Sequence, residues 1–529
     1  MVRSVVDSWL NNPINEICSI FEENYSKKQT LNIFSDFGVQ ECFLNVFYSN
    51  SQREKIPSLE STPRESLHTG RLVRMTCMIQ DTSFGQEICM GAYKIEGEGW
   101  KLSRYDLLTP ERSTLDPSDP TILLDERQCL YATSIPGESE WLQEDLANML
   151  NSLSLDTSSG TCISERFALK DQKHLAVILK TYAGMEASFR VCNLVEVIGI
   201  LEKDTETVQE FMTNEQYTVK LHLPIIHVIH MNMIDLNELV TRDLGTMKQD
   251  DILKTRKDII NHLATIFCND VLVAEFLLLN LVSSVSSRLP AIILGSFPIN
   301  IRNCTPTISL KFKEFLKNVI PAFVYEKIDI YNLNNNKFYP SSDGEKLQAG
   351  IMQLAKGTIV CFDETSMDEG TLNDTGIKNI RSLSQVVMSQ VLPFHFSFSE
   401  FEIETDLTII VLSKNEKTLL PVDTSISIRP QPLSDSTLLL SLTSDKLLQF
   451  RKYFAYTRQI SVGISNDISE KIQLDFVQQR QFGNKIGEKE LGFRISVAKL
   501  ISKTCGSKSV SWDHWINAVR LTSSIEALK

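Results

Sequence analysis

The hydrophobic and polar positions along this chain change their period several times, and each change predicts a different kind of structure. Over about residues 12–47 the pattern is typical of helices, and Pro13 stands where a helix can begin without losing a hydrogen bond. The Pro- and Ser-rich stretch 49–65 predicts a linker. Residues 1–65 are therefore predicted to be an N-terminal helical segment and linker, and they are a candidate docking arm.

From Leu72 the period becomes two, which is typical of strands that are half buried. The segment LVRMTCMIQD places four apolar side chains on one face: Val73, Met75, Cys77 and Ile79. After a turn at Gly85, ICMGAYKI is predicted to be its hairpin partner, and strands resume at HLAVILKTY and NLVEVIGIL beyond a polar surface loop at 151–161. Several short strands with turn signals predict a small barrel or sandwich over residues 66–232.

After about Met231 helical patterns alternate with short apolar runs. DILKTRKDIINHLATIF places four residues near one helical face: Ile252, Ile259, Leu263 and Phe267. The runs PAIIL, GTIVCFDE and LTIIVLS are apolar on both faces, as expected for parallel strands between helix layers. Residues 233–443 are predicted to be an α/β domain, and residues 444–529 a helical domain.

Composition sets limits on the chemistry of the chain. Its 529 residues, 42% hydrophobic and 22% charged, suffice for roughly three or four domains. A formal net charge of −13 disfavours broad nucleic-acid binding, which needs a positive surface, and favours protein partners. Eleven cysteines stand singly, with no Cys-x-x-Cys pair, and the most apolar run, VLVAEFLLLNLV, is too short to span a membrane. We expect a soluble, intracellular chain without metal or cofactor.

One short motif is typical of nucleotide-hydrolysing sites. The run 359–364 is an apolar strand that ends in Asp363 and Glu364, as in the Walker B pattern. Such a site also needs a Gly-rich loop ending in Gly-Lys-Ser/Thr between a strand and a helix. After the predicted strand 291–294 comes GSFPINI, which has no lysine and contains Pro298, a residue without an N–H donor. We therefore expect the two acids to be structural relics, and we assign no catalytic, cofactor-binding or metal-binding residue.

The histidines do not predict a metal site. His222, His227 and His230 lie close in sequence, but on a strand or loop they would not converge. No spaced cysteine or carboxylate accompanies them, so buried or solvated histidines are the plainer interpretation.

Aromatic and basic residues offer a nucleic-acid alternative. Four alternating phenylalanines can stack on bases, although a strand that packs a core is the simpler interpretation: Phe394, Phe396, Phe398 and Phe401. A groove in the first β region would have these cations and rings, against the plainer alternative of a solvated strand face: Arg71, Arg74, Lys94, Lys101, Arg104, Tyr93, Trp100 and Tyr105.

Two ordered series of segments resemble known families. The first resembles a minichromosome maintenance (MCM) helicase subunit. GRLVRMTCMIQD and NLVEVIGIL resemble its OB-fold strands, VCFDE its Walker B strand, LTIIVLS its sensor strand, and FRKYFAYTRQISVGISNDISEKIQLDFV its helical lid, with Arg451, Lys452, Tyr453, Tyr456 and Arg458. The second resembles the MCM-binding protein family itself, through LVRMTCMIQD with CMGAY, PGESEWLQE, HLATIF with VAEFLLLNLVS, DETSMDEGTLNDTGI and ISNDISEKIQLDFV.

The chain departs from the helicase pattern where the chemistry would be. The Gly-rich loop is lost, no zinc-binding cysteine pairs interrupt the OB region, and no Ser-Arg-Phe-Asp arginine-finger segment precedes the lid. Arg494 stands near the sensor-two position but would have no phosphate to sense.

The resemblance implies a multidomain fold of mixed α+β and α/β type. Its parts are an N-terminal helical segment (1–65), an OB-like β domain with insertions (66–232), a degenerate AAA+-like α/β domain without Walker A (233–443) and a helical lid (444–529). It implies a non-enzymatic nuclear factor that binds MCM helicase subunits and regulates helicase assembly or unloading in DNA replication, the cell cycle and sister-chromatid cohesion. The alternatives are a single-stranded nucleic-acid-binding OB-fold protein and an active AAA+ ATPase.

Overall fold

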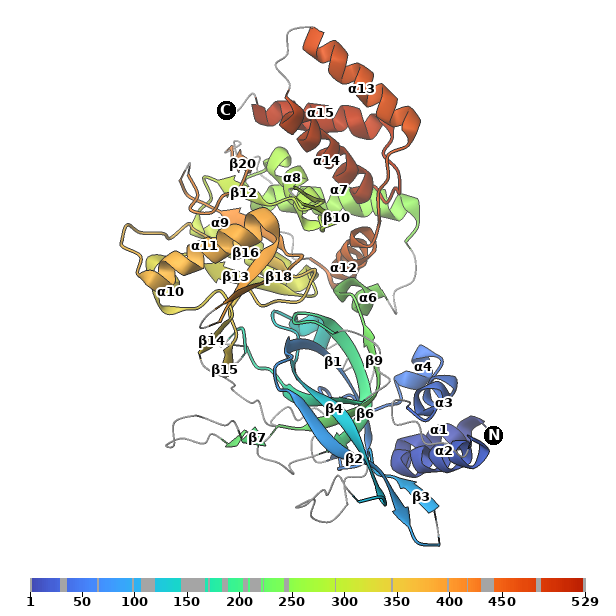
Figure 1. The fold of residues 1–529 in the computed structure, drawn as a ribbon. Helices are drawn as coiled ribbons and strands as arrows, with labels where there is room; N and C mark the ends of the chain where they lie inside the picture. The colour runs from blue at the N-terminus through green and yellow to red at the C-terminus, as the bar shows by residue number, and fades with distance from the viewer. Residues whose placement is uncertain are drawn as a thin grey trace. The chain divides into compact units, whose positions relative to one another are not determined.

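The computed structural model describes most of the chain, and the contacts divide it into two compact units (Figure 1). The N-terminal unit comprises Met1–Pro136, Gln143–Ile234 and Ser341–Ala349, and the C-terminal unit comprises Gly137–Leu142, Asp235–Pro340 and Gly350–Lys529. The described residues are 2–28, 36–63, 66–97, 99–105, 119–143, 167–169, 172–182, 189–202, 208–209, 220–221, 223–241, 247–290, 292–343, 346–396, 399–415, 417–429, 442–481 and 487–526. The polar loop expected at 151–161 lies outside them.

Four helices open the N-terminal unit: α1 (Val2–Asn11), α2 (Pro13–Lys28), α3 (Val39–Val46) and α4 (Asn50–Arg53). The apolar faces of α1, α2 and α3 join one buried cluster with strand residues, and the rings of Trp9 and Phe43 meet edge to face at 5.5 Å between centroids. The stretch expected to be a linker is partly folded. Ser58 pairs with Arg74 of the first strand, and the Leu59 N–H donates to the Arg74 carbonyl at 2.8 Å. These helices and this segment are therefore built into the unit.

A seven-stranded sheet forms the centre of this unit, in the order β1-β6-β9-β5-β4-β2-β3. Its strands are β1 (Leu72–Asp81), β2 (Gln86–Ile95), β3 (Gly99–Leu102), β4 (Ile122–Thr133), β5 (Ala176–Tyr182), β6 (Leu194–Glu202) and β9 (Ile225–Met233), and β7 (Val208–Gln209) pairs with β8 (Lys220–Leu221). Because β1 also pairs with β4, the strands β1, β6, β9, β5 and β4 close into a ring. Closure is what distinguishes a barrel from an open sheet.

The predicted hairpin between β1 and β2 is wrong. β1 has β6 and β4 as its neighbours, whereas β2 pairs with β4 and β3. A strand in a closed ring already has both edges occupied, so the next strand in sequence must pair elsewhere. The predicted apolar face is confirmed, since Val73, Met75, Cys77 and Ile79 are all buried in one cluster. The opposite face is buried as well, as Leu72 and Met78 show.

The C-terminal unit contains a parallel sheet of five strands in the order β13-β16-β19-β12-β20. These strands are β12 (Ile299–Arg302), β13 (Phe323–Lys327), β16 (Ile359–Asp363), β19 (Thr408–Leu412) and β20 (Thr424–Ser427). Two antiparallel hairpins accompany it: β10 (Ser287–Leu289) with β11 (Ile292–Leu294), and β17 (Val391–His395) with β18 (Glu400–Glu404). A third hairpin, β14 (Ser341–Asp343) with β15 (Lys346–Gln348), is assigned to the N-terminal unit. The predicted strands at GTIVCFDE and LTIIVLS are confirmed as β16 and β19.

The predicted buried strand at PAIIL is wrong. β11 pairs in antiparallel fashion with β10, and Ile292 is 58% exposed. Gly295 then turns the chain at φ +93°, where an added Cβ would come within 2.3 Å of the Ser284 carbonyl oxygen. The parallel strand is β12, one turn later. A short apolar run without periodicity does not reveal whether it lies inside a sheet or on an exposed hairpin.

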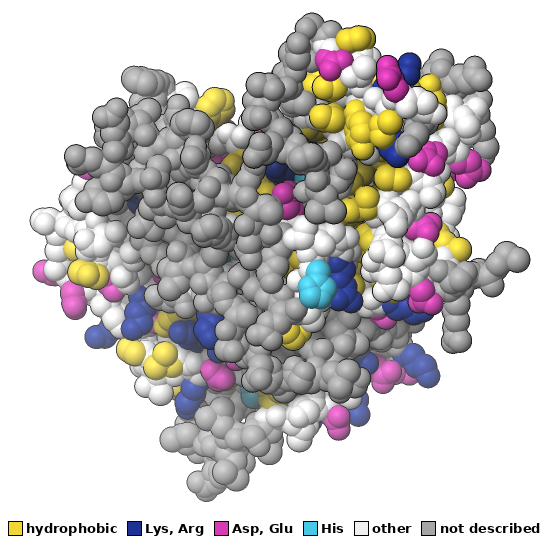
Figure 2. Space-filling view, turned by 90° about the horizontal axis from the view of Figure 1, so that it is seen from below, with side chains coloured by type: hydrophobic (Ala, Val, Ile, Leu, Met, Phe, Trp, Pro, Cys, Tyr) yellow, Lys and Arg dark blue, Asp and Glu magenta, His cyan; other side chains and the backbone are white. Residues whose placement is uncertain are grey.

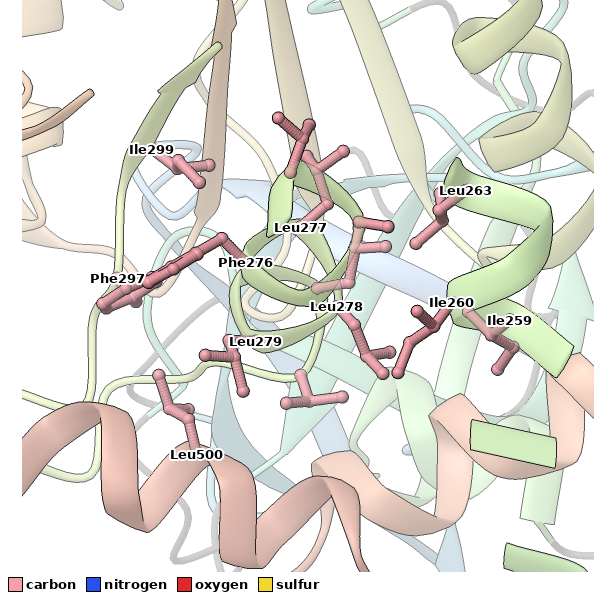
Figure 3. Close-up of a cluster of buried hydrophobic side chains, with 14 of the residues drawn as sticks. Ile259, Ile260, Leu263, Phe276, Leu277, Leu278, Leu279, Phe297, Ile299 and Leu500 are labelled. Atoms are coloured by element: carbon pink, nitrogen blue, oxygen red, sulfur yellow. The ribbon is translucent and has the colours of Figure 1, made fainter. Parts of the chain in front are cut away.

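Helices cover this sheet and complete the unit: α6 (Leu236–Thr241), α7 (Gln249–Ile266), α8 (Val271–Leu281), α9 (Pro306–Val319), α10 (Ile330–Asn335), α11 (Asp374–Ser389), α12 (Ser444–Arg458), α13 (Asn466–Gln481), α14 (Glu488–Thr504) and α15 (Trp512–Glu526). Helix α8 is apolar around most of its circumference, and it packs against α7, α14 and the strands β12 and β19. Figure 3 shows Phe276, Leu278 and Leu279 pointing outward from this helix in different directions. The expected core face of α7 and the helical C-terminal region are confirmed.

A short segment from the first half of the sequence folds with the C-terminal unit. In Gly137–Leu142 the Gly137 carbonyl accepts from the Phe323 N–H at 2.7 Å, and the Ser139 N–H donates to the Pro321 carbonyl at 2.9 Å. The Arg451 guanidinium lies 4.1 Å from the ring centroid of Trp141. Residues 137–142 of the PGESEW region therefore pack against the start of β13 and against α12, which lie far apart in the sequence.

Candidate functional site

The acid pair lies at the carboxyl edge of the parallel sheet. Because β12, β16 and β19 run parallel, their carboxyl ends meet at one edge, and in such sheets this edge is where ligands bind. β16 ends at Asp363, with Glu364 next, and β12 ends at Arg302 before α9 begins at Pro306. The edge therefore brings together the two features that a nucleotide site needs, a strand-end acid and a strand-to-helix turn.

Donors from the chain itself occupy the carboxylate of Asp363. Ser309 Oγ of α9 donates to it at 2.8 Å, and the Thr365 N–H donates at 2.8 Å. The Tyr325 hydroxyl of β13 also donates to this carboxylate. Burial and this hydrogen bond raise the pKa of Tyr325, so the phenol stays protonated and keeps donating. Asp363 is 4% exposed, and its acceptor positions are directed at protein groups.

Glu364 is held in the same way. Thr418 Oγ1 donates to its Oε1 at 2.8 Å, and the Leu419 N–H donates to its Oε2 at 3.2 Å. Burial raises the pKa of Glu364. Nearby thiols are inert for the same reason, since burial raises the pKa of Cys304 to about 12 and that of Cys361 well above its usual value. A general base needs a free acceptor facing a substrate, and these two carboxylates face their own chain.

The turn between β12 and α9 cannot replace a phosphate-binding loop. It consists of Asn303, Cys304 and Thr305, whereas the Gly-rich loop of nucleotide hydrolases runs over eight positions. Thr305 caps α9 by accepting from the Ile308 N–H at 3.4 Å. The predicted position of the loop at GSFPINI is wrong, because Ile299–Arg302 is itself the sheet strand and the strand-to-helix turn follows it. The conclusion stands at the correct turn, which contains neither glycine nor lysine.

Two arginines that the sequence singled out, Arg494 and Arg458, have structural partners in the described part of the chain. Arg494 donates to Gln479 Oε1 at 2.8 Å and to Glu490 at 2.7 Å, within the helical region. Arg458 is buried and donates to the carbonyls of Leu281 at 3.3 Å and Gly357 at 2.9 Å. Sequence reasoning missed this role of Arg458 and also Ser309 and Tyr325, because nothing local marks a donor that reaches across the fold.

The histidines are separated rather than clustered. His227 lies buried between the Tyr182 hydroxyl at 2.5 Å and Glu202 Oε2 at 2.8 Å, whereas His230 faces Gln40 at 3.3 Å. His222 lies outside the described residues. Among the described residues, no group of three or more His, Cys, Asp or Glu side chains is placed to hold a metal ion.

The basic residues proposed for a nucleic-acid groove do not share one exposed surface. Arg104 and Tyr105 are 2% and 3% exposed, and Arg104 pairs with Asp125 at 2.6 Å. Arg71 and Arg74 donate to the carbonyls of Ser66 and Ile56. Trp100 packs against the buried cluster beneath the N-terminal helices. On the face shown in Figure 2, described Lys and Arg side chains are interspersed with Asp and Glu.

The aromatic residues around β17 form a small cluster. The ring centroids of Phe394 and Phe396 are 4.2 Å apart, and those of Phe396 and Phe401 5.2 Å. Phe394 is 9% exposed and Phe401 57% exposed, while Phe398 lies outside the described residues.

Among the helices that the structure describes, none combines the length and the hydropathy that a membrane span requires.

The fold and the site define a mixed α+β chain of two units whose strand-end acids accept hydrogen bonds from its own side chains and backbone N–H groups. Residues 43–165 and 151–527 match the family model described as mini-chromosome maintenance replisome factor, so the chain belongs to that family. It is 29% identical to UPF0616 protein C1687.04 of Schizosaccharomyces pombe, over 97% of both chains. It is 26% and 24% identical to the mini-chromosome maintenance complex-binding proteins of Gallus gallus and Homo sapiens, over 98% of this chain and 96% and 97% of theirs.

Proposed function

We propose that this protein is a non-enzymatic nuclear factor that binds the MCM helicase complex and regulates its assembly or unloading in DNA replication and sister-chromatid cohesion. The observation that carries the proposal is the family match over nearly the whole chain, with relatives matched over 96% and 97% of their own length that are named as MCM complex-binding proteins. Full-length similarity matters because a binding role inferred from one shared domain would not extend to the rest of the chain.

The acid pair supports a role without catalysis. Asp363 and Glu364 accept hydrogen bonds from the protein's own hydroxyl and N–H groups, and the neighbouring turn is three residues long. A nucleotide would have to displace these donors and would find no Gly-rich loop to hold its phosphates. The names of the relatives, which describe binding proteins, agree with this interpretation.

Two features support the finer proposal of a degenerate helicase-like architecture. The closed ring of five strands fits an OB-like barrel. In the C-terminal unit, β16 carries the acid pair inside a parallel sheet, and four helices from α12 to α15 follow that sheet, as a lid would. Such a chain would keep the packing surfaces of a ring subunit and lack its chemistry.

The first experiment is to mix the purified protein with MCM subunits, singly and combined, without nucleotide, and to measure the mass of each species after size-exclusion chromatography. A stable complex of defined mass is the expected result, and it identifies the subunits that bind. Failure to co-elute with any subunit or combination would contradict the proposal. Imaging of a fluorescently tagged chain tests the nuclear location, which a purely cytoplasmic signal would contradict.

A second measurement separates binding from catalysis. A ligand that binds only the folded state stabilises it by RT ln(1 + [L]/Kd), which raises the thermal unfolding midpoint. Because we expect no nucleotide to bind, ATP with Mg²⁺ should leave this midpoint unchanged. A concentration-dependent rise that the Asp363→Asn substitution removes would instead favour the ATPase alternative.

A further inference from the structure

Among the strands that the structure describes, none pairs with the outer edge of β18. β18 (Glu400–Glu404) pairs with β17 on one side and ends the order of its sheet. Four of its five residues are exposed, and only Ile403 is half-buried. An edge strand of this kind presents backbone N–H and C=O groups that another strand can pair with.

The register shows which residues face outward. The Thr405 N–H donates to the Gln390 carbonyl at 2.9 Å and the Phe396 N–H to the Ser399 carbonyl at 2.8 Å, so hydrogen-bonded pairs alternate between these two ends. Phe401 and Ile403 bond inward to β17. The backbone groups of the three glutamates between them point away from β17: Glu400, Glu402 and Glu404.

The side chains along this edge are strongly acidic. Glu400 faces Arg381 at 3.9 Å and His395 at 3.6 Å, and Glu404 faces Arg288 at 3.8 Å, which are long ion pairs. Within the described residues, Glu402 has no cationic partner. The other face of the strand carries Phe401, which is 57% exposed. An incoming strand would therefore meet carboxylates on one face and an aromatic ring on the other.

The row of glutamates selects the occupant. Two copies of β18 pairing in antiparallel fashion about Glu402 would place carboxylate against carboxylate, which is destabilising. Nucleic acid is repelled by the same charges. A segment with Lys or Arg at alternate positions would set its cations against the glutamates and its apolar side chains against Phe401, while its main chain bonds to the edge.

We propose that β18 is a docking edge for an extended basic segment of a partner protein, which adds to the β17–β18 hairpin as a further strand. The inference goes beyond the proposed function, since it specifies the chemistry of a bound segment and stands or fails without reference to MCM subunits.

The test is fluorescence anisotropy of the full-length protein with a labelled peptide that alternates Lys and Val. Its control peptide has Pro in place of each Val, so it keeps the charge but cannot form a strand ladder. We expect saturable binding of the first peptide, at least about tenfold tighter than that of the second. Equal binding of the two peptides would mean non-specific attraction to an acidic protein and would overturn the proposal.

Two variants locate the site. Glu402→Pro removes one outward N–H and no bond to β17, and we expect it to weaken binding at least about tenfold. Glu402→Lys keeps the backbone and reverses the charge, and it should also weaken binding by about tenfold or more. Glu488→Gln, which changes an exposed glutamate of α14, should leave binding unchanged.

Circular dichroism confirms folding of each variant, and Glu402→Lys keeps the test decisive if the proline variant unfolds. Unchanged binding in folded Glu402→Lys would overturn the proposal. Light scattering gives a further arm, because a dimer of the wild type that Glu402→Lys dissociates would identify a second copy as the occupant and would also overturn it.

Discussion

One buried carboxylate site in each unit can be compared, because different groups satisfy the two sites. In the N-terminal unit, Asp125 pairs with Arg104 at 2.6 Å, and the two side chains are 4% and 1% exposed. Next to this pair, the side chain of Glu87, which is 42% exposed, pairs with two buried cations, Arg127 at 2.7 Å and Lys180 at 3.2 Å. In the C-terminal unit, neutral hydroxyl and N–H groups donate to Asp363 and Glu364.

The two sites should differ in how much stability the fold loses when one partner is removed. A buried ion pair becomes an uncompensated charge when one partner is deleted, so its two halves depend on each other. When a carboxylate held by neutral donors is removed, only unsatisfied hydrogen-bond donors remain. These cost less free energy than an uncompensated buried charge. The acid pair of the C-terminal unit therefore links β16 to α9 and to the segment around Thr418 through hydrogen bonds. The N-terminal network is instead stabilised by buried ion pairs.

The largest effect is expected from Arg104→Leu. It leaves Asp125 buried without its cation, and we expect the N-terminal unit to lose about 3–5 kcal/mol of unfolding free energy. Urea denaturation followed by tryptophan fluorescence measures this loss. The double variant Arg104→Leu/Asp125→Leu should recover most of it, and Lys94→Leu, an exposed position on β2, should change little. A loss below about 1 kcal/mol would show that water reaches Asp125.

A smaller effect is expected from Asp363→Ala. The donors Ser309, Tyr325 and Thr365 lose their acceptor, and we expect the C-terminal unit to be destabilised by about 2–3 kcal/mol. Asp363→Asn keeps one acceptor oxygen and should cost less. Chemical denaturation measures the unfolding free energy of both variants. Equal stability of the wild type and the alanine variant would show that the hydrogen bonds to Asp363 do not stabilise the C-terminal unit.

The pH dependence of the N-terminal unit should follow His227. Burial lowers the pKa of His227 below its ordinary value of 6.5, despite its hydrogen bond to Glu202 and in keeping with the nearby cations Lys180 and Arg127. The unfolded chain then binds the proton more readily, so stability is full above pH 6.5 and falls as the pH drops. The slope from one proton is at most about 1.4 kcal/mol per pH unit. In the His227→Gln variant, the unfolding free energy from urea denaturation should change less between pH 7 and pH 5 than it does in the wild type. An unchanged slope of unfolding free energy against pH would assign the dependence to other groups.

The smallest effect is expected from Glu364→Gln. The raised pKa of Glu364 means that its protonated form stabilises the fold below its ordinary pKa of 4.5 and that this contribution is lost as the pH rises. At pH 7 the neutral glutamine should therefore lie within about 1 kcal/mol of wild type. Paired thermal melts at pH 7 and pH 5 test this, because the wild type should gain relative to the variant at the lower pH. A gain by the variant instead would contradict the assigned direction.

Much of the local structure was readable from the sequence. The alternation at Val73 to Ile79 predicted β1 and its buried face, and the helical period at Ile252 to Phe267 predicted α7. The apolar run before Asp363 predicted β16. These predictions succeeded because strand and helix periods are properties of a few neighbouring residues. That the sequence contains no Gly-Lys-Ser/Thr loop was also readable, since this depends only on which residue types are present.

Partners across the fold were decided by the tertiary structure alone. The closed ring set the neighbours of β1, and the exposed hairpin of β10 and β11 showed that PAIIL was not a sheet strand. Ser309 and Tyr325 reach Asp363 from 54 and 38 residues away in sequence. Composition and period record what each residue is and which face it occupies. Only the packing of distant segments decides which donor meets which carboxylate, because that depends on long-range contacts that no local pattern encodes.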